Sequence, residues 1–409
     1  MSWAFYIPFL LIFIVFFNRY FFGLFLWVTH PDKFKTKPMK EDSESVEDYP
    51  NICVIIPLYN EGIGIQKTLQ SIVSQNYPPN ALEVIVVDDC STDNSYDVAC
   101  GFLSQMSYLR VIKNPVNLGK RLGIASAVKQ TQAPYIISVD SDVELLPGAL
   151  VQLMSQFTSP RVVAVGGQVL VSNATQNWLT GLQSIKYFLA YRFLKNIENR
   201  FKSVLCLSGC LTAYRRAALE EVDPILKDRN LFGIPIKYGE DRFLTRQLLK
   251  LGYQTVLNLD ARCATKAPHR LSGYFSQQIR WRRSNIVDVM GGVFHLWKLN
   301  PFVSLHYFSL HAMLMCYPIF LWTVFLRESF FWGVFFHLGV LALYGLVYGV
   351  CTCNWEPKHR ANPLCALGLG LLLPVSYLAL SLLALFTIDS GSWETRGHKG
   401  HSILKPTIR

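Results

Sequence analysis

The chain has 409 residues, of which 51% are hydrophobic and only 16% are charged, whereas about 25% of the residues in a typical soluble domain are charged. This balance argues against a wholly soluble protein, and the length allows a soluble domain of ordinary size beside a membrane part. The formal net charge is +11, but the cations gather beside apolar runs, which favours membrane lipid over nucleic acid as the partner.

The first predicted element is an apolar helix over Trp3–Val28. It is long enough to cross a bilayer and too long for the apolar part of a signal peptide, so we expect a retained membrane anchor within residues 1–30. A polar, acidic linker follows from Lys33 to Tyr49. Three further apolar runs come late in the chain, over Phe302–Leu326, Phe330–Cys353 and Pro363–Ile388.

Between these ends, apolar runs rich in β-branched residues alternate with helical patterns. Predicted buried strands cover Ile52–Pro57, Leu82–Val87, Leu109–Ile112 and Tyr135–Val139. A helix over Gln66–Gln75 is expected between the first two strands. This alternation predicts an α/β fold, a doubly wound parallel sheet whose loops cluster at one edge.

Acidic or amide side chains follow three of the predicted strands: Asn60 and Glu61, Asp88 and Asp89, and Asp140 and Asp142. Ligands of α/β folds bind beyond the carboxyl ends of the strands, where these side chains emerge. Two carboxylates one residue apart suit Mn²⁺ or Mg²⁺ carrying a phosphorylated substrate. The second pair has another interpretation, in which the acidic and hydroxyl residues from Asp88 to Asp93 cap a helix.

A second helix is predicted to begin at Asn117–Arg121, where Lys120 and Arg121 bring two cations to its first turn. A helix N-terminus with cations suits a diphosphate group. A solvated basic turn explains the same residues equally well.

Two later stretches, Trp178–Phe201 and Tyr274–Trp297, combine aromatic, aliphatic and basic residues at helical spacing. They are too short and too polar to span a bilayer, so we expect interfacial helices, with ordinary packed amphipathic helices as the alternative. The ten cysteines include no Cys-x-x-Cys pair and no zinc-like spacing, which indicates reduced thiols.

With these motifs in order, the chain from about residue 50 to 397 resembles the membrane-embedded processive family 2 glycosyltransferases. It is most similar to bacterial hyaluronan synthases, and the rhizobial chitooligosaccharide synthases are near relatives. The stretches that carry the resemblance are Val54–Glu61, Asn117–Arg121, Val139–Asp142, Cys206–Gly209, Tyr214–Arg216, Gly239–Thr245, Gln277–Ser284 and Trp393–Arg396. The resemblance implies a GT-A type, mostly parallel sheet fused to transmembrane and interfacial helices.

The resemblance also implies a role for individual residues. Asp88 and Asp89 match acids that hold uridine, while Asp140 and Asp142 match a pair that binds the diphosphate through Mn²⁺ or Mg²⁺. The remaining matches are Asp241 to the catalytic base, Arg280 to a pyrophosphate contact, Trp281 to an aromatic that stacks on the acceptor, and Trp393 and Arg396 to a terminal motif that closes over the nucleotide.

These residue types fit the chemistry without the resemblance. A sugar hydroxyl needs a positioned carboxylate to take its proton as it attacks C1, and direct displacement turns an α-linked donor sugar into a β-linkage. Cations such as Arg280 and a metal ion stabilise the departing diphosphate. The indole of Trp281 suits the apolar face of a pyranose. A membrane-interface anchor is the alternative for Trp281–Arg283.

The chain departs from the hyaluronan synthase pattern at four places. Cys90 stands where glycine is usual, and Cys210 stands where proline is usual. Asn285–Asp288 replaces an aromatic run followed by Arg-Glu, and Glu394 replaces a glycine in the terminal motif. None of these differences removes an acid that we assign to catalysis, but together they bear on the choice of substrate.

We therefore expect a processive inverting β-glycosyltransferase that polymerises UDP-N-acetylglucosamine and UDP-glucuronate and moves the polysaccharide across the membrane. The alternative is a chitooligosaccharide synthase that uses UDP-N-acetylglucosamine only. A membrane scaffold with an inactive transferase domain is a third possibility, against which the intact acids argue. The partners expected are UDP-sugars, the growing acceptor chain and membrane lipid, with no nucleic acid.

The expected organisation is a cell-membrane, multi-pass protein with a cytoplasmic catalytic domain. Residues 50–265 form that GT-A domain and residues 266–300 an interfacial helix. Residues 301–390 form a C-terminal transmembrane region, and residues 391–409 a cytoplasmic tail. Basic residues on both flanks place the tail on the cytoplasmic side, so Pro363–Ile388, with Pro374 near its middle, is expected to be a re-entrant hairpin or an interfacial segment.

Overall fold

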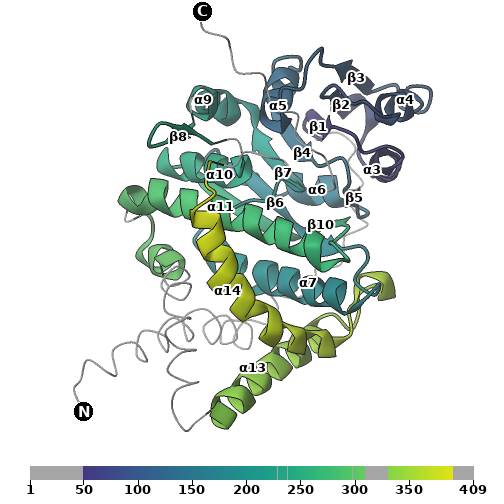
Figure 1. Cartoon of the computed structure of the whole chain (residues 1–409). Helices are drawn as coiled ribbons and strands as arrows, with labels where there is room; N and C mark the ends of the chain where they lie inside the picture. The colour runs from purple at the N-terminus through teal and green to yellow at the C-terminus, as the bar shows by residue number, and fades with distance from the viewer. Residues whose placement is uncertain (1–48, 228, 237, 297, 309–329, 390–409) are drawn as a thin grey trace, which may run out of the picture.

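The computed structural model describes residues 49–227, 229–236, 238–296, 298–308 and 330–389. Its centre is an eight-stranded mixed sheet with the strand order β3-β2-β1-β4-β7-β6-β10-β5 (Figure 1). The strands of this sheet are β1 (Ile52–Leu58), β2 (Leu82–Asp88), β3 (Leu109–Lys113), β4 (Tyr135–Val139), β5 (Glu144–Leu145), β6 (Val162–Val171), β7 (Leu211–Arg215) and β10 (Gln254–Thr265). A separate hairpin consists of β8 (Asn230–Leu231) and β9 (Ile234–Pro235).

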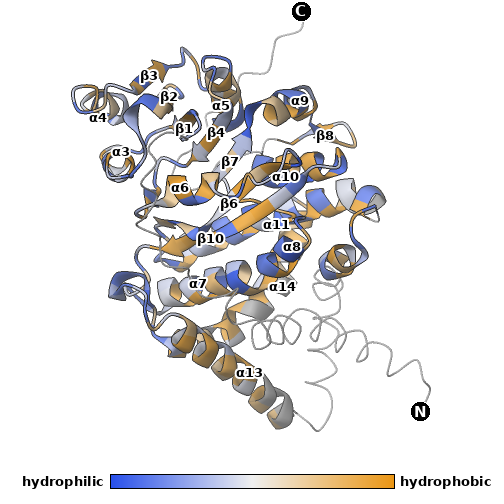
Figure 2. Cartoon of the chain, turned by 180° about the vertical axis from the view of Figure 1, so that it is seen from behind, coloured by the Kyte–Doolittle hydropathy of each residue, from blue (hydrophilic) through white to orange (hydrophobic). Residues whose placement is uncertain are grey.

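The parallel half of the sheet is the part that the sequence predicted. Strands β1 to β4 lie at the four expected places, and β1 pairs in parallel with both β2 and β4, while β2 pairs in parallel with β3. Helices cover both faces of these strands, so β1, β2 and β4 read as nearly continuous apolar runs, whereas β3 at the edge of the sheet is partly exposed; Figure 2 colours the chain by hydropathy. The prediction of a doubly wound α/β sheet is confirmed for this half.

The other half of the sheet contains an antiparallel strand that the sequence analysis did not predict. Strand β7 runs antiparallel to both β4 and β6, while β10 runs parallel to β6. Because Leu211 pairs with Val139, β7 begins at the edge where β4 ends. Strand β10 ends at that same edge, with Thr265. The sheet is therefore mixed, and its mostly parallel strands bring the residues on either side of β4, β7 and β10 together.

The helices connect and cover these strands. Those before β7 are α3 (Gly64–Val73), α4 (Ser95–Cys100), α5 (Lys120–Val128), α6 (Ala149–Met154), α7 (Trp178–Leu189) and α8 (Lys195–Arg200), with a 3₁₀ turn η4 (Pro79–Ala81) and a π-helical turn η5 (Ala190–Leu194). Those after β7 are α9 (Arg216–Lys227), α10 (Glu240–Lys250), α11 (Leu271–Leu296), α13 (Phe330–Cys351) and α14 (Leu369–Leu385), with 3₁₀ turns η6 (Pro357–His359) and η7 (Pro363–Gly368).

Helix α7 is packed inside the protein. Asn177 caps its first turn by accepting a hydrogen bond from the Thr180 N–H, and the Thr180 hydroxyl accepts one from the Asn177 N–H in return. The helix lies between strand β6 on one side and η7 and α13 on the other. Most of its residues are buried, so a packed helix, the alternative interpretation, describes α7.

The late apolar segments form helices as well. The segment Phe330–Cys353 contains α13, and Pro363–Ile388 contains η7 and α14. Helix α14 continues through Pro374 and does not form a hairpin, while the other form expected there, an interfacial segment, stays a prediction. No helix in the described part of the chain is long and apolar enough to cross a membrane, so the predicted transmembrane region over residues 301–390 is not confirmed there. The predicted anchor Trp3–Val28 and most of Phe302–Leu326 lie outside the described residues.

Candidate active site

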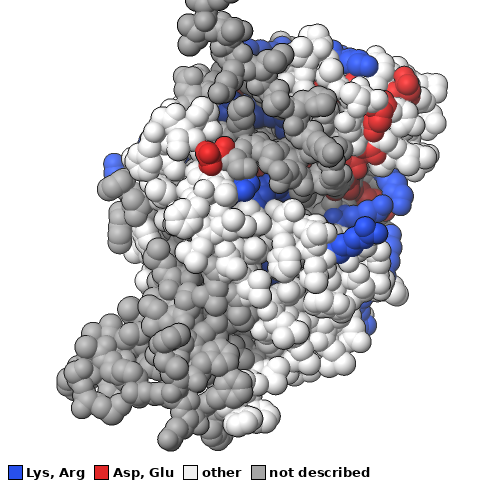
Figure 3. Space-filling view, viewed as in Figure 1, with Lys and Arg blue, Asp and Glu red and all other residues white. Residues whose placement is uncertain are grey.

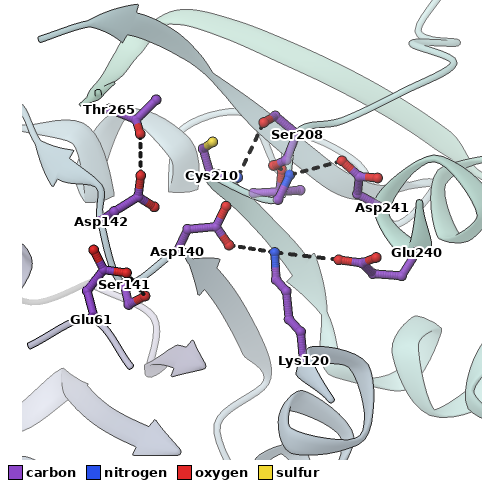
Figure 4. Close-up of polar contacts among 12 residues, drawn as sticks. Glu61, Lys120, Asp140, Ser141, Asp142, Ser208, Cys210, Glu240, Asp241 and Thr265 are labelled. Carbon is purple, nitrogen blue, oxygen red and sulfur yellow. Dashed lines mark hydrogen bonds and ion pairs between the residues drawn. The ribbon is translucent and has the colours of Figure 1, made fainter. Parts of the chain in front are cut away.

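The centre of the candidate site is the loop that follows β4. Asp140 and Asp142 lie on this loop, and the Nζ atom of Lys120 is 2.5 Å from the Asp140 Oδ1 atom (Figure 4). The same Nζ atom is 3.5 Å from the Glu240 Oε1 atom. Lys120 therefore links the two acids, one after β4 and the other at the start of α10.

Lys120 owes its position to the start of α5. Gly119 has φ +83° immediately before the helix, a backbone conformation that glycine adopts without strain. Burial alone would lower the pKa of Lys120, but Asp140 and Glu240 outweigh burial and raise it. For Asp140 burial acts in the opposite sense, and the ammonium of Lys120 holds the pKa of the carboxyl below its usual value. Both groups are therefore charged at neutral pH.

Asp142 is oriented by a side chain from a distant strand. The hydroxyl of Thr265, the last residue of β10, donates a hydrogen bond of 2.5 Å to the Asp142 Oδ2 atom (Figure 4). The sequence analysis missed Thr265, because β10 itself was not predicted. A hydroxyl that holds a carboxylate in one orientation is the usual neighbour of a metal ligand.

Asp241 occupies the first turn of α10, directly after the left-handed Gly239 (φ +67°) and Glu240. Its Oδ1 atom accepts the backbone N–H of Arg242 at 2.8 Å, and its Oδ2 atom accepts the N–H of Gly209 at 3.3 Å. The positive end of the helix dipole favours a carboxylate at this place. Gly209 lies in the loop before β7, which brings Asp241 to the same edge of the sheet as Asp140.

The backbone at Gly209 lies close to the ammonium of Lys120. A Cβ added to Gly209 would lie 2.7 Å from the Lys120 Nζ atom, so a larger residue here would require the ammonium to move. The next residue, Cys210, has a thiol whose pKa is raised by burial and by the nearby Asp140 and Asp142. This thiol therefore stays protonated and adds no negative charge beside the two carboxylates.

The acids that follow β2 hold the loops of the site together. Asp89 accepts the N–H groups of Leu118 and Gly119 at 2.8 and 2.7 Å, as well as the Asn114 side-chain amide at 2.9 Å. These bonds fix the loop that presents Lys120. Asp88 is buried and accepts the N–H of Ser91. Contacts of Asp88 and Asp89 with uridine stay a prediction.

Asn60 and Glu61 join the loop after β1 to its neighbours. Asn60 accepts the N–H of Thr92 at 2.8 Å, and the Ser141 hydroxyl donates to the Glu61 Oε2 atom at 3.4 Å. Asp93 accepts the N–H of Ser95, the first residue of α4, at 3.0 Å, while the N-cap residue Asn94 makes no side-chain cap bond. Acidic side chains gather over this part of the sheet, at the upper right of Figure 3, with lysine and arginine side chains directly below them.

The backbone explains one departure from the pattern of the hyaluronan synthases. Cys90 has φ +65°, the left-handed conformation that glycine adopts without strain. The glycine usual at this position therefore reflects a requirement of the turn, which this chain meets with a strained cysteine.

Arg280 and Trp281 are adjacent residues of α11. The Nε atom of Arg280 is buried and has no hydrogen-bond partner among the residues that the structure describes. The charge of Arg280 helps to lower the pKa of Asp140, which places the guanidinium within electrostatic reach of that acid. Trp281 is 36% exposed, and its ring lies 6.2 Å from the ring of Tyr187 on α7.

Hydrogen bonds of Lys186, on α7, join this helix to α11. The Nζ atom of Lys186 donates hydrogen bonds to the Gln278 Oε1 atom at 3.0 Å and to the Tyr274 hydroxyl at 3.2 Å. Burial, together with the charge of Arg282, lowers the pKa of Lys186 to about 7. The helix that carries Arg280 and Trp281 is thus held rigidly against α7.

The structure brings the predicted site residues at the strand ends and at the starts of α5 and α10 to one edge of the sheet, with Arg280 within electrostatic reach of Asp140. Trp281 contacts the ring of Tyr187, and Trp393 and Arg396 lie outside the described residues. Glu240 and Thr265 belong to the same cluster, although the sequence analysis assigned neither of them a role. Glu240 could have been found from its place beside Asp241 in the Gly-Glu-Asp-Arg motif, whereas nothing in the local sequence points to Thr265.

The donor atoms of this site fit a divalent metal that is shared with a phosphate. Among the described residues no group of three or more His, Cys, Asp or Glu side chains is placed to hold a metal ion alone. Mg²⁺ is, however, commonly held by one or two carboxylates together with substrate phosphates and water. Asp140 already accepts a cation, the Lys120 ammonium, at its Oδ1 atom. The pair of Asp140 and Asp142 can thus contribute ligands to such a shared metal.

Comparison with known proteins identifies relatives of the chain. The family model described as glycosyl transferase family 2 matches residues 53–223. An N-acetylglucosaminyltransferase of Rhizobium meliloti is 36% identical over 257 residues, and one of Sinorhizobium fredii is 30% identical over 362 residues, covering 85% of this chain and 84% of the relative. A hyaluronan synthase of Streptococcus pyogenes is 29% identical over 374 residues, covering 89% of this chain and 85% of the relative.

The extent of the similarity differs among these relatives. The match to the Rhizobium meliloti protein covers 62% of this chain and 60% of the relative, so the chain spans less than two thirds of its length. Among solved structures, a mannosyltransferase of Pyrobaculum calidifontis in complex with GDP-Man and Mn²⁺ aligns with a TM-score of 0.52 at 18% identity. That alignment covers 93% of this chain and 96% of the other, and it supports a GT-A-like fold.

Proposed function

Because the chain belongs to glycosyl transferase family 2, we propose that it transfers N-acetylglucosamine from UDP-N-acetylglucosamine to a growing β-linked chain. Membership of the family makes the protein a hexosyltransferase with a nucleotide-sugar donor. The observation that carries the mechanism is the position of Asp241, whose carboxylate shares one edge of the sheet with Asp140 and Asp142 through the contacts of Gly209 and Lys120.

The comparisons favour the alternative of the sequence analysis over its main expectation. The relatives named N-acetylglucosaminyltransferase include proteins that are 36% and 34% identical to the chain, against 29% for the streptococcal hyaluronan synthase. We therefore place a polymer of N-acetylglucosamine alone before hyaluronan. The hyaluronan alternative keeps one supporting observation, since the streptococcal synthase matches 89% of this chain.

The proposed reaction is a single displacement. The acceptor hydroxyl attacks C1 of the donor sugar and gives its proton to the Asp241 carboxylate, while the bond from C1 to the diphosphate oxygen breaks and UDP leaves with the electron pair. Lys120 and Arg280 lie where they can stabilise the charge of the departing diphosphate. A bound Mn²⁺ or Mg²⁺, held by Asp140 and Asp142, would supply further neutralisation of that charge.

The acceptor is proposed to stack on Trp281. Its indole contacts the ring of Tyr187 and is partly exposed, so the exposed part of the indole is available to the apolar face of a sugar ring. The proposed donor-side residues Asp140 and Lys120 belong to other elements, the loop after β4 and the start of α5. In this arrangement the acceptor hydroxyl approaches Asp241 between the stacking surface and the diphosphate.

Incubation of the purified protein with UDP-N-acetylglucosamine alone tests the proposed donor. We expect chitinase-sensitive oligomers and release of UDP, and we expect no change in the product when UDP-glucuronate is added. Mass spectrometry of the product provides the measurement, and digestion with hyaluronidase provides the control. Product that forms only when both donors are present would contradict the proposal and restore the hyaluronan alternative.

We also propose that the protein is attached to the cell membrane with its catalytic domain on the cytoplasmic side. The apolar runs Trp3–Val28 and Phe302–Leu326, together with the basic tail after Arg396, support this proposal. Sedimentation of the full chain with membranes after washing with carbonate at high pH provides the test, and recovery of the protein in the wash would contradict it.

A further inference from the structure

Helices α10 and α11 carry two residues whose relative position matters most for the proposed reaction. Asp241, the proposed base, is in the first turn of α10, and Arg280, the proposed diphosphate contact, is near the middle of α11. In the proposed reaction Asp241 takes the proton of the acceptor hydroxyl, and Arg280 stabilises the departing diphosphate. Their separation therefore depends on how the two helices are docked.

The first docking contact is at the catalytic end of α10. Gly239 precedes the helix, and a Cβ added to it would lie 2.8 Å from the Cβ atom of Ser284 on α11. Such a distance is too short for two carbon atoms, so the close approach requires glycine. Ser284 is one helical turn beyond Arg280, and Gly239 is two residues before Asp241, so this contact fixes one point of the geometry.

The second docking contact is a buried ion pair of Arg246, which lies about two helical turns beyond Gly239. The Nε atom of Arg246 is 3.2 Å from the Asp288 Oδ1 atom, and the Arg246 Nη1 atom donates a hydrogen bond of 2.5 Å to the Asp288 backbone oxygen. Only 9% of the Arg246 side chain and 5% of the Asp288 side chain are exposed. The hydroxyl of Tyr307 donates to the Asp288 Oδ2 atom at 3.0 Å and so completes the set.

The sequence of α11 makes room for this arginine. Gly291 and Gly292 are adjacent glycines inside a 26-residue helix, where glycine weakens the helix relative to alanine. A Cβ added to Gly291 would lie 3.0 Å from the Arg246 Nη2 atom, and one added to Gly292 would lie 2.9 Å from the Nη1 atom. The absence of a Cβ at both positions therefore leaves room for the Arg246 guanidinium against α11.

We propose that Arg246, Asp288 and Tyr307 form a clamp that positions Asp241 against Arg280 by locking α10 to α11. Arg246 and Asp288 are positioning residues, because they act through the helices that carry the reacting groups. The inference rests on the proposed function, in which Asp241 is the base and Arg280 contacts the diphosphate. The clamp adds three residues that catalysis would require although they contact neither the donor nor the acceptor.

The chemistry of the pair predicts a particular kind of defect. When one member of a buried ion pair is removed, the other charge is left uncompensated in the interior, and the surrounding elements must move to reach water or a new partner. A displacement of a reacting group by about 1 Å costs about 10²-fold in rate. Of the proposed donor contacts, Arg280 is on α11, but Asp140, Asp142 and Lys120 belong to other elements, so most of the affinity for the donor is expected to survive.

The test compares the full chain with four variants in donor turnover, UDP affinity and thermal unfolding. Arg246→Gln and Asp288→Asn remove one charge each, Arg246→Lys keeps the charge, and Tyr307→Phe removes a single hydrogen bond. Arg215→Gln is the matched control, because Arg215 also makes three hydrogen bonds, to Val162, Ser159 and Tyr135, but at the end of β7 far from the site.

We expect Arg246→Gln and Asp288→Asn to lower kcat about 100-fold, with KM for UDP-N-acetylglucosamine and the Kd for UDP within about threefold of wild type. The double variant Arg246→Gln/Asp288→Asn should lose no more kcat than either single variant, because the two residues act as a unit. Arg246→Lys should recover part of kcat, and Tyr307→Phe should lose about 10-fold, which keeps the test open if the charge variants fold poorly.

The control decides between positioning and general stability. Arg215→Gln should lower the unfolding temperature without changing kcat. If both charge variants and Tyr307→Phe kept the kcat of that control, the clamp would be rejected while the proposed function stood. If the wild-type chain released no UDP from any UDP-sugar, the proposed function would be rejected, and the clamp with it.

Discussion

Asp241→Asn is expected to abolish polymer formation, with a loss of about 10²–10⁴ in rate, the usual range for removal of a general base. Asparagine has the same size as aspartate, but its amide cannot take the proton of the acceptor hydroxyl. The side-chain oxygen can still accept the Arg242 N–H, which is the shorter of the two bonds that now hold the carboxylate. The fold of α10 should therefore be unchanged, and only the chemical step should suffer.

The affinity of Asp241→Asn for UDP separates the loss of the base from general damage. The proposed donor contacts, among them Asp140, Asp142 and Lys120, are untouched by this change, so UDP affinity should stay close to that of wild type while turnover disappears. Glu240→Gln is the matched control on the same helical turn and should show a much smaller loss of turnover. Wild-type turnover in Asp241→Asn would show that the base has been assigned to the wrong residue.

Asp142→Asn is expected to weaken Mn²⁺-dependent UDP binding by at least about 100-fold, because even the loss of a residue behind a metal ligand commonly costs about 10–100-fold. The amide oxygen can still accept the Thr265 hydroxyl, which now holds the carboxylate at 2.5 Å, so the loop should keep its shape. What disappears is the negative charge that a hard divalent cation prefers.

Titration of UDP in the presence of Mn²⁺ and again with EDTA measures the effect of Asp142→Asn. Thr265→Val is the matched control, since it leaves the charge of Asp142 in place and removes only the orienting hydrogen bond. Its loss should be about 10-fold, smaller than that of Asp142→Asn. If UDP bound to the wild-type chain with the same affinity in Mn²⁺ and in EDTA, the metal assignment to Asp140 and Asp142 would be wrong.

The sequence was sufficient for the features that depend on local residues. The runs that became β1, β2 and β4 are rich in β-branched residues and are buried on both faces, so their composition identifies them as strands. The acids that follow them could be assigned to one edge of the sheet because parallel strands end together. The start of α5 was likewise predicted within the segment Asn117–Arg121.

The sequence was insufficient for features that depend on pairing between distant segments. Strand β7 is only five residues long and contains Thr212 and Arg215, so its composition does not identify it as a buried central strand. The role of Thr265 follows from the pairing of β10 with β6, about ninety residues earlier in the chain, and no local pattern encodes it. The bonds of Asp89 to Leu118 and Gly119 depend on tertiary structure in the same way.

The linkage formed in the product tests the central claim most directly, namely that the sugar is transferred in a single displacement, the reaction for which Asp241 is the proposed base. The donor sugar is α-linked in UDP-N-acetylglucosamine, so direct attack on C1 must give a β-linkage. NMR spectroscopy of oligomers made by the wild-type chain from this donor resolves the anomeric configuration. The account predicts β-linkages throughout, and α-linkages would contradict it, because retention requires a different set of catalytic groups.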